Sequence, residues 1–181
     1  MKYYIGIDNG VTGSIAVINE AGSLLHYAPT PTAKTLNYTK VKEFITRVVL
    51  QDLSTLLLKY PGATVVLERP MLNPLRWTAS VSAIRCDEAT RGVIEAIGLK
   101  LIYVDSKEWQ SVMLPSRKAV TRLAKGATPT EKAAQKKLTA AFALETKELS
   151  LMVAQRLFPK TSFKKDGDAC LIAEWARKNN L

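Results

Sequence analysis

Four acidic side chains stand where the chain could bring carboxylates close together. Asp8 directly follows the apolar run Tyr3–Ile7, and Glu68 closes a second apolar run that begins at Thr64. Neighbouring strands of an α/β sheet present the side chains at their ends into one crevice, so these two carboxylates are expected to meet there. Apolar surroundings make such charges unfavourable unless a cation neutralises them, and Mg²⁺ favours carboxylate oxygens.

The other two carboxylates, Asp166 and Asp168, precede an apolar helical segment that starts at Ala169. Three or four carboxylates from separate elements suit a two-metal site that cleaves phosphodiesters. In such a site two ions about 4 Å apart activate water and stabilise the leaving oxygen. Taken singly, Asp8 also fits a turn, and Asp166 or Asp168 fits a helix N-cap. The four together favour the metal site.

The composition narrows the chemistry further. A single histidine, His26, leaves no material for zinc sites built on paired histidines, so a metal must be held by oxygen. Hydrophobic residues at 47% and charged residues at 23% are globular values, and no apolar run approaches the ~20 residues of a membrane span. Cys86 and Cys170 fit buried thiols of a reducing compartment. Because Asp8 and Asn9 interrupt the apolar centre that an export signal needs, we expect a cytoplasmic protein.

The charge is unevenly spread. The net charge is +10, and residues 107–181 contribute 15 basic and 7 acidic residues, against 11 and 9 in residues 1–106. A basic half of this kind is typical of a protein that binds a polyanion, because each neutralised phosphate releases condensed counterions. A basic surface that serves only solubility is the alternative.

The pattern along the chain predicts one α/β domain over residues 1–181, with a mixed five-stranded sheet flanked by helices. Three strands form an antiparallel meander and the others run parallel, while a basic elaboration lies at about 111–145. We expect a mobile loop or lid over 115–128, and a long helix that starts at a Thr128 cap and breaks near Thr146. The expected elements are strands over 3–7, 13–18, 24–27, 64–68 and 100–104, and helices over 40–59, 78–97, 105–109, 128–158 and 168–178.

Several segments, taken together, resemble the RuvC-type Holliday junction resolvases of the RNase H-like superfamily. The resemblance covers nearly the whole chain in the right order, so it is more specific than any one motif. Two segments, Thr146–Ser150 and Ala154–Pro159, look most like phage-encoded members. The segments that carry the family resemblance are Ile5–Ala16, Val65–Pro70, Glu88–Val93, Tyr103–Trp109 and Asp168–Glu174.

The resemblance implies an RNase H-like fold and a homodimer that binds four-way DNA and makes paired, Mg²⁺-dependent nicks. Two ions would serve each active site, with Mn²⁺ as a substitute. Asp8, Glu68 and Asp168 would be metal ligands, and Lys107 and Lys147 would lie near the scissile phosphate. A phage-encoded member would act in the cytoplasm of the host cell.

The chain departs from the bacterial pattern near its last motif. The bacterial enzymes place the last two ligand residues three apart, but Lys165 stands three before Asp168. Asp166 stands two before, and residues two apart do not share a helical face. Both carboxylates can therefore reach one metal only if Asp166 precedes the helix, which Gly167 permits. We rank Asp168 as the surer ligand, with Asp166 as a ligand or a helix cap.

The candidate DNA contacts lie in three stretches. Met71 falls three residues after Glu68, where the bacterial enzymes place an aromatic wedge; it fits a wedge or simple packing. Residues 117–165 hold 12 basic and 3 acidic residues, which we interpret as an elaboration for DNA contact. The predicted DNA-binding residues are Arg69, Met71, Arg76, Arg117, Lys118, Arg122, Lys125, Lys164 and Lys165.

Three other functions are open to such a sequence. A nuclease of the same fold could act more loosely on forks, flaps or three-way branches, since only shape recognition would differ. A junction-binding protein could have the fold without catalysis. The hairpin after Asp8 also resembles that of the actin and sugar-kinase ATPases, but those need two such domains and a second glycine-rich loop, so we expect no nucleotide cofactor.

A symmetric dimer would hold two such active sites in fixed relation, and the helix at 78–97 is the candidate interface. The small residues Ala79, Ala83 and Ala89 would let a partner helix approach closely. The same face could instead pack on the sheet, with Val81, Ile84 and Ile94 forming a second apolar stripe.

Overall fold

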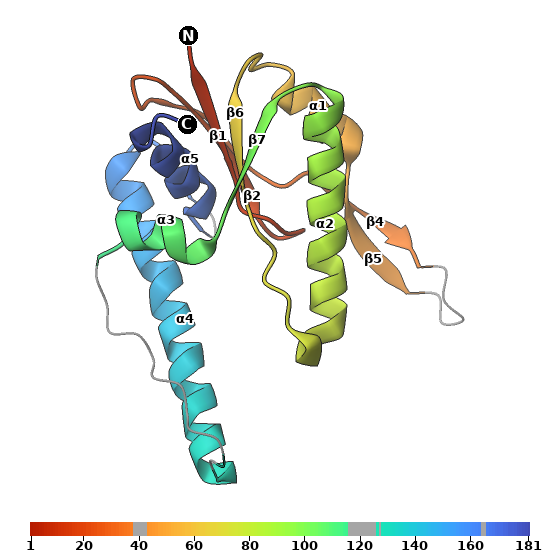
Figure 1. Ribbon diagram of the computed structural model, residues 1–181, viewed down its shortest axis with the longest axis vertical. Helices are drawn as coiled ribbons and strands as arrows, with labels where there is room; N and C mark the ends of the chain where they lie inside the picture. The colour runs from red at the N-terminus through yellow and green to blue at the C-terminus, as the bar shows by residue number, and fades with distance from the viewer. Residues whose placement is uncertain (38–42, 116–125, 127, 164–165) are drawn as a thin grey trace.

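The protein, described by a computed structural model, is built around the predicted mixed sheet. The structure describes all residues except 38–42, 116–125, 127, 164 and 165. Five strands have the order β3-β2-β1-β6-β7, in which β1 pairs antiparallel with β2 and parallel with β6. Figure 1 shows these strands fanned across the middle of the molecule. Their bounds are β1 Tyr3–Ile7, β2 Ser14–Asn19, β3 Leu24–Pro29, β6 Thr64–Glu68 and β7 Lys100–Val104.

Alternating side chains bury both faces of the sheet. In β1, Ile5 and Ile7 pack towards α1 (Leu50–Leu57) and α2 (Trp77–Ala96), whereas Tyr4 belongs to the core beneath α5 (Asp168–Lys178). This is the period of two that a strand covered on both faces requires. A Cβ at Gly6 would overlap the backbone of Ala169 and Ala173, so α5 lies directly on β1 because position 6 has no side chain.

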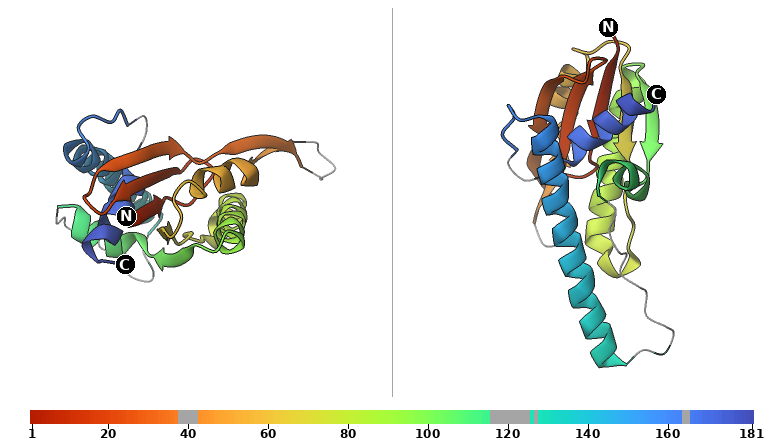
Figure 2. Two further views of the ribbon diagram at one scale, coloured as in Figure 1. Left: turned by 90° about the horizontal axis from the view of Figure 1, so that it is seen from above. Right: turned by 90° about the vertical axis from the view of Figure 1, so that its left-hand side faces the viewer.

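A β-hairpin replaces the first half of the helix expected over 40–59. β5 (Phe44–Val48) pairs antiparallel with β4 (Thr32–Leu36), and of the described residues expected to be helical here, only those of α1 are. Positions 40–42 of the expected helix lie outside the described residues. Phe44, Ile45, Thr46 and Val48 are aromatic or β-branched, which favours a strand, and their spacing fits either period over so short a stretch. The hairpin extends away from the sheet (Figure 2), so the prediction of a helix there was wrong.

The two ends of α2 differ in burial, and this difference bears on the two roles expected for the helix, packing on the sheet and contact with a partner helix. Its last turns bury Val93 and Ile94 on the sheet, whereas its first turns leave Trp77 72% and Ile84 39% exposed. The small residue Ala79 is exposed as well. Packing on the sheet therefore occupies the C-terminal part of the helix and leaves the N-terminal part open. A short 3-10 turn, η1 (Pro74–Arg76), leads into it.

Two helices after β7 begin with reciprocal caps. At α3 (Ser106–Met113), Asp105 and Glu108 exchange hydrogen bonds with each other's backbone, and at α4 (Pro129–Leu157) Thr128 and Glu131 do the same. α4 continues without the break expected near Thr146, whose hydroxyl donates to the carbonyl of Phe142 at 2.6 Å. Figures 1 and 2 show that α4 extends well beyond the sheet. The loop or lid expected over 115–128 falls mostly outside the described residues.

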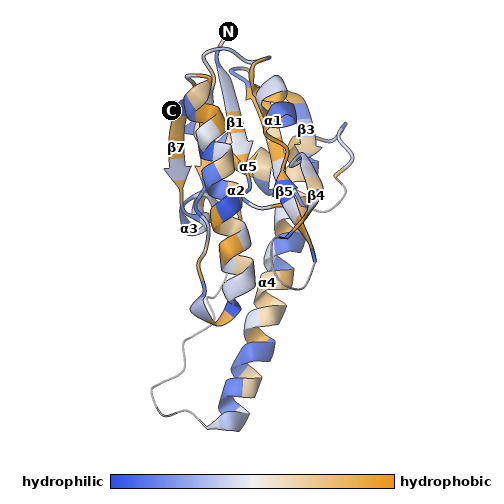
Figure 3. Cartoon of the chain, turned by 90° about the vertical axis from the view of Figure 1, so that its right-hand side faces the viewer, coloured by the Kyte–Doolittle hydropathy of each residue, from blue (hydrophilic) through white to orange (hydrophobic). Residues whose placement is uncertain are grey.

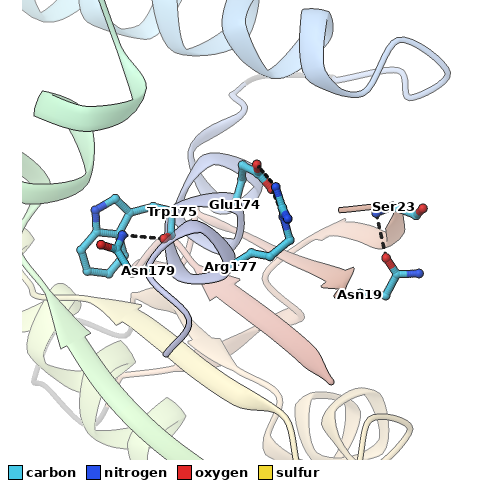
Figure 4. A network of polar contacts seen from close by, with 6 residues as sticks. All are labelled: Asn19, Ser23, Glu174, Trp175, Arg177 and Asn179. Atoms are coloured by element: carbon cyan, nitrogen blue, oxygen red, sulfur yellow. Dashed lines mark hydrogen bonds and ion pairs between the residues drawn. The ribbon is translucent and has the colours of Figure 1, made fainter. Parts of the chain in front are cut away.

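The far end of α5 contains a partly buried ion pair between two residues of the helix. The Arg177 guanidinium donates to both carboxylate oxygens of Glu174, at 2.8 and 2.7 Å (Figure 4). Arg177 also lies against Gly22 in the turn between β2 and β3, where Asn19 accepts from the Ser23 amide. The C-terminal helix is thus tied to the first hairpin as well as to the centre of the sheet.

Two other sequence expectations have a structural outcome. Cys86 and Cys170 are both buried and unbridged, as predicted. Over the described parts of the chain, no helix has the length and apolar character needed to cross a membrane.

Candidate active site

The first two acidic residues lie side by side because their strands do. β1 and β6 are adjacent and parallel, so Asp8, directly after β1, and Glu68, at the end of β6, share one edge of the sheet. Each follows a run of fully buried residues, which holds its backbone in place. The charge of Glu68 raises the pKa of Asp8, so the two carboxyl groups lie close to each other. The Trp109 indole of α3 donates to Glu68 Oε1 at 3.2 Å, which fixes the orientation of this carboxylate.

The second pair of acidic residues reaches the same edge through α5. This helix lies across β1, and its first residue is Asp168. Asp166 precedes the helix, separated from it by Gly167, so the two carboxylates are free of the helical spacing that would turn them apart. A side chain at position 167 would overlap Ala154 of α4, which explains the glycine there.

Electrostatic repulsion shows that the four carboxylates converge. Burial raises the pKa of Asp8 well above its ordinary value, and the charges of Glu68, Asp168 and Asp166 raise it further. Burial also raises the pKa of Glu68, although the Trp109 hydrogen bond opposes this shift. Burial and neighbouring charge thus disfavour the charged forms of Asp8, Glu68 and Asp168, which a cation at the centre would relieve.

The two C-terminal carboxylates are oriented by hydroxyl groups from other elements. The Ser150 hydroxyl of α4 donates to Asp168 Oδ1. The Ser14 hydroxyl of β2 donates to Asp166 Oδ1 at 2.8 Å, and the Tyr27 hydroxyl donates to the carbonyl of Asp166 at 2.6 Å. Burial and the nearby Asp166 raise the pKa of Tyr27 to about 12, so this hydroxyl keeps its proton at neutral pH. Sequence reasoning missed Ser14, Tyr27 and Ser150, because only the folded chain brings them to these carboxylates.

The two candidate lysines have different surroundings. Lys147 is exposed on α4, one turn from Ser150, and its charge lowers the pKa of Asp168 against the raising effects of burial and Asp166. Lys107 is exposed in the first turn of α3, two residues before Trp109. The structure therefore places Lys147 within electrostatic reach of the carboxylates, and Lys107 on a neighbouring helix.

A hollow of about 470 Å³ opens beside Glu68. Arg69, Met71 and Arg76 line it together with the N-terminal part of α3. Arg69 lies 3.4 Å from Asp105 and 5.4 Å from the centre of the Tyr103 ring, so it is held at the rim. Met71 is 80% exposed, which excludes core packing for it. The other predicted DNA contacts, Arg117, Lys118, Arg122, Lys125, Lys164 and Lys165, lie outside the described residues.

The site offers oxygen ligands of the kind that bind a hard cation. Their present arrangement does not form a coordination site. Within the part of the chain that the structure describes, no group of three or more His, Cys, Asp or Glu residues is positioned to hold a metal ion as it stands. Four mutually repelling carboxylates nevertheless supply oxygen ligands of the kind that Mg²⁺ prefers. The residues present therefore fit a divalent cation in type and in charge.

Comparison with known proteins gives a structural likeness without a sequence likeness. No protein-family model matches the chain, and no curated protein matches its sequence. The structure of T. thermophilus RuvC in complex with a Holliday junction substrate matches with a TM-score of 0.60 and 11% identity, over 99% of this chain and 96% of that chain. A second Thermus thermophilus RuvC structure matches with a TM-score of 0.49 and 10% identity, over 98% and 96%. From the first of these matches and its own sheet topology, this chain has a RuvC-like fold of the RNase H-like class.

Proposed function

We propose that this protein is a metal-dependent, structure-selective DNA endonuclease that resolves four-way junctions by paired nicks. The observation that carries the proposal is the convergence of Asp8, Glu68, Asp166 and Asp168, from three separate elements, at one edge of the sheet. The RuvC-like fold supports it, since the matched structure holds a Holliday junction substrate.

Asp8, Glu68 and Asp168 would hold two Mg²⁺ ions per site, with Asp166 as a further ligand and Mn²⁺ as a substitute. Bound there, such ions supply an activated water and stabilise the leaving oxygen of a phosphodiester. The protein's own groups keep the ligands ready: Trp109 orients Glu68, and Ser150 orients Asp168. Preorganised ligands of this kind need little rearrangement when the substrate arrives.

Lys147 would attract the scissile phosphate to the carboxylates. Its ammonium group is exposed and already interacts with Asp168, so a phosphate drawn to a cation held by these carboxylates would lie within its reach. Lys107 would do the same from α3, and Arg69, Met71 and Arg76 would contact the branch from the hollow beside Glu68. Met71 is exposed enough to act as an apolar wedge between bases.

The test compares four-way, three-way, flap and linear duplex DNA of equal length, with Mg²⁺ and with a chelator. We expect paired incision of the four-way junction in Mg²⁺ and none in the chelator. Equal cleavage of all branched substrates would instead favour the looser branched-DNA nuclease. Tight junction binding without incision in Mg²⁺ or Mn²⁺ would favour the catalytically silent binding protein.

Two opposed cuts need two active sites, so we propose a homodimer with a twofold axis. The open N-terminal part of α2 supports this proposal: Trp77, Val81 and Ile84 line a hollow of about 680 Å³ between this helix and the β4–β5 hairpin. Light scattering at micromolar concentration should give about twice the chain mass of 20.0 kDa, with or without DNA. A monomer that nicks one strand and never the other would rule the dimer out.

A further inference from the structure

The N-terminal part of α4 stands clear of the rest of the described protein. The helix spans 29 residues, but its buried residues, Ser150 and Ala154, lie in its last turns. No residue of the segment 129–145 is buried, and Figures 1 and 2 show this segment extending past the end of the sheet. Because this segment buries little surface against the part of the protein that the structure describes, we look to its charges for a function.

Four of the lysines of α4 gather on one side of the helix. At about 100° per residue, Lys132, Lys136 and Lys137 all lie within about 80° of the direction of Lys147. The acidic residues of the helix lie about 100° or more away from that direction, and Arg156 lies opposite, in the last turn. These acidic residues are Glu131, Glu145 and Glu148. We call Lys132, Lys136, Lys137 and Lys147 the lysine row.

The lysine row continues the face that packs on the body. Ser150 and Ala154 lie on the side of α4 that carries Lys147, and there they meet Asp168 and Gly167. Towards the N-terminus the same side carries lysines instead of buried residues, with Ala140 and Ala143 between them. Figure 3 shows hydrophilic turns recurring along the projecting part of the helix. The row thus leads from the carboxylates outwards, on the side of the helix that faces them.

The lysine row is exposed and carries an unneutralised charge. All four side chains are exposed, and none of them forms an ion pair with any other residue that the structure describes. The alanine side chains between the lysines are small, so a bulky polyanion can approach the helix closely. A second helix is a poorer occupant, because this face has no continuous seam of large apolar residues.

We infer that the lysine row is a track for the phosphate backbone of one duplex arm that leads to the carboxylates. The inference rests on the proposed function and adds residues that lie far from the reacting phosphate. At 1.5 Å per residue, Lys137 and Lys132 lie about 15 and 22 Å from Lys147 along the helix. At about 3.4 Å per base pair, these lysines would meet phosphates roughly four to seven base pairs from the cut.

The test measures junction binding in a chelator, so that nothing is cut. The variant Lys132→Gln/Lys136→Gln/Lys137→Gln removes three charges and keeps good helix-forming residues. Its matched control is Lys59→Gln/Lys100→Gln/Lys178→Gln, which removes three exposed charges outside α4: one just after α1, one at the start of β7 and one at the end of α5. A triple Lys→Arg variant of the row keeps the charge. Far-UV circular dichroism checks that each variant is folded.

We expect the row variant to bind a four-way junction at least about tenfold more weakly at ~0.1 M salt. The slope of log affinity against log salt should fall by about two to three, since each phosphate contact contributes about one unit. The Lys→Arg variant should retain wild-type binding, and the control should change much less. Equal losses in the row variant and the control would overturn the inference, because the effect would then be one of net charge.

Neutral methylphosphonate linkages locate the contacts on the DNA. Placed about four to seven base pairs from the cut, they should weaken binding by the wild type and add little to the loss in the row variant, since both changes remove the same contacts. Additive losses would overturn the inference, as would a row variant with wild-type affinity and salt slope. Row-dependent binding of poly-glutamate together with row-independent binding of DNA would assign the row to an acidic protein instead.

The outcomes separate this inference from the proposed function. A wild type that binds junctions through the row without cutting them in Mg²⁺ would contradict only the proposed nuclease. A wild type that cuts four-way DNA as expected, and whose row variant binds and cuts equally well, would contradict only the lysine row.

Discussion

The two ends of α5 both hold carboxylates that are shielded from water in full or in part, but among the described residues only the C-terminal end pairs its carboxylate with a basic side chain. At the C-terminal end, Glu174 is 5% exposed and receives two hydrogen bonds from Arg177. At the N-terminal end, Asp168 lies with Asp8, Glu68 and Asp166, and the charges of Glu68, Asp166 and Asp168 all raise the pKa of Asp8. Among the described residues, Lys147 is a cation whose charge acts on Asp168, and its side chain is exposed.

This difference distinguishes Glu174, a carboxylate that stabilises the fold, from a cluster of carboxylates whose arrangement suits the binding of a cation. A buried carboxylate with a matched guanidinium is complete, and it gains nothing from an added ion. A cluster of carboxylates stays unfavourable until a cation enters, so its arrangement makes sense for binding rather than for stability. The following changes test whether the two ends of one helix really divide the work in this way.

The largest expected effect is on the clustered end. Asp8→Asn removes one proposed ligand and one repulsive charge, so incision of a four-way junction in Mg²⁺ should fall by at least about 1,000-fold. DNA binding should be equal or tighter, because less negative charge faces the phosphates. Gel-based incision and binding assays measure both. Near-normal cleavage by this variant would show that the clustered carboxylates are not the catalytic ones.

The second prediction compares the two aspartates around Gly167. Asp168→Asn should be as inactive as Asp8→Asn, since Asp168 opens α5 at the cluster and is oriented by Ser150. Asp166→Asn should keep partial activity if the main role of Asp166 is to receive the Ser14 hydrogen bond, because an amide oxygen still accepts it. Single-turnover incision rates measure the difference. An active Asp168→Asn variant would mean that the wrong carboxylate has been assigned.

The sequence predicted the elements that carry the cluster because each combines a buried run with a carboxylate at its end. β1 and β6 are short apolar runs that stop at Asp8 and Glu68, and α5 begins at Asp168 as expected. The mixed sheet was predicted for the same reason, since turn residues and periods mark its strands clearly. Local patterns were sufficient to predict an element where the spacing of its apolar residues fitted either a strand or a helix, but not both.

Local patterns failed where two periods fitted or where the partner is distant in sequence. Ile45 and Val48 suit a helical face three residues apart, and pairing with β4 decided for a strand instead. Ser14 and Ser150 carry no signal that links them to Asp166 and Asp168, since 152 and 18 residues separate the partners. The exposed half of α2 was hard to assign because its small residues fit a sheet or a partner helix equally well.

The third prediction concerns the paired end of α5. Glu174→Gln leaves the Arg177 guanidinium without its carboxylate, and we expect the free energy of unfolding to fall by about 2 kcal/mol. The loss stays moderate because 30% of the Arg177 side chain is exposed, so water can solvate it. Junction incision should be unchanged while the variant is folded. Chemical denaturation and the incision assay together check this, and a loss of activity at full stability would contradict the division of roles.

The smallest expected effect concerns His26, a half-buried side chain that is expected to stay neutral in the folded protein at neutral pH. Burial lowers the pKa of His26 below its ordinary value of 6.5, and the charge of Lys59 lowers it further. Its Nε2 is buried, with no hydrogen-bond partner among the described residues. In the unfolded chain His26 takes up a proton below about pH 6.5, while the folded chain resists it. Stability contributed by the neutral form is therefore present above pH 6.5 and lost as the pH falls through the lowered folded value.

Relative to His26→Gln, the wild type should lose free energy of unfolding between pH 7 and pH 5, as measured by urea denaturation. Parallel pH profiles of the two proteins would show that His26 takes up a proton as readily in the folded state as in the unfolded state, which would contradict the prediction.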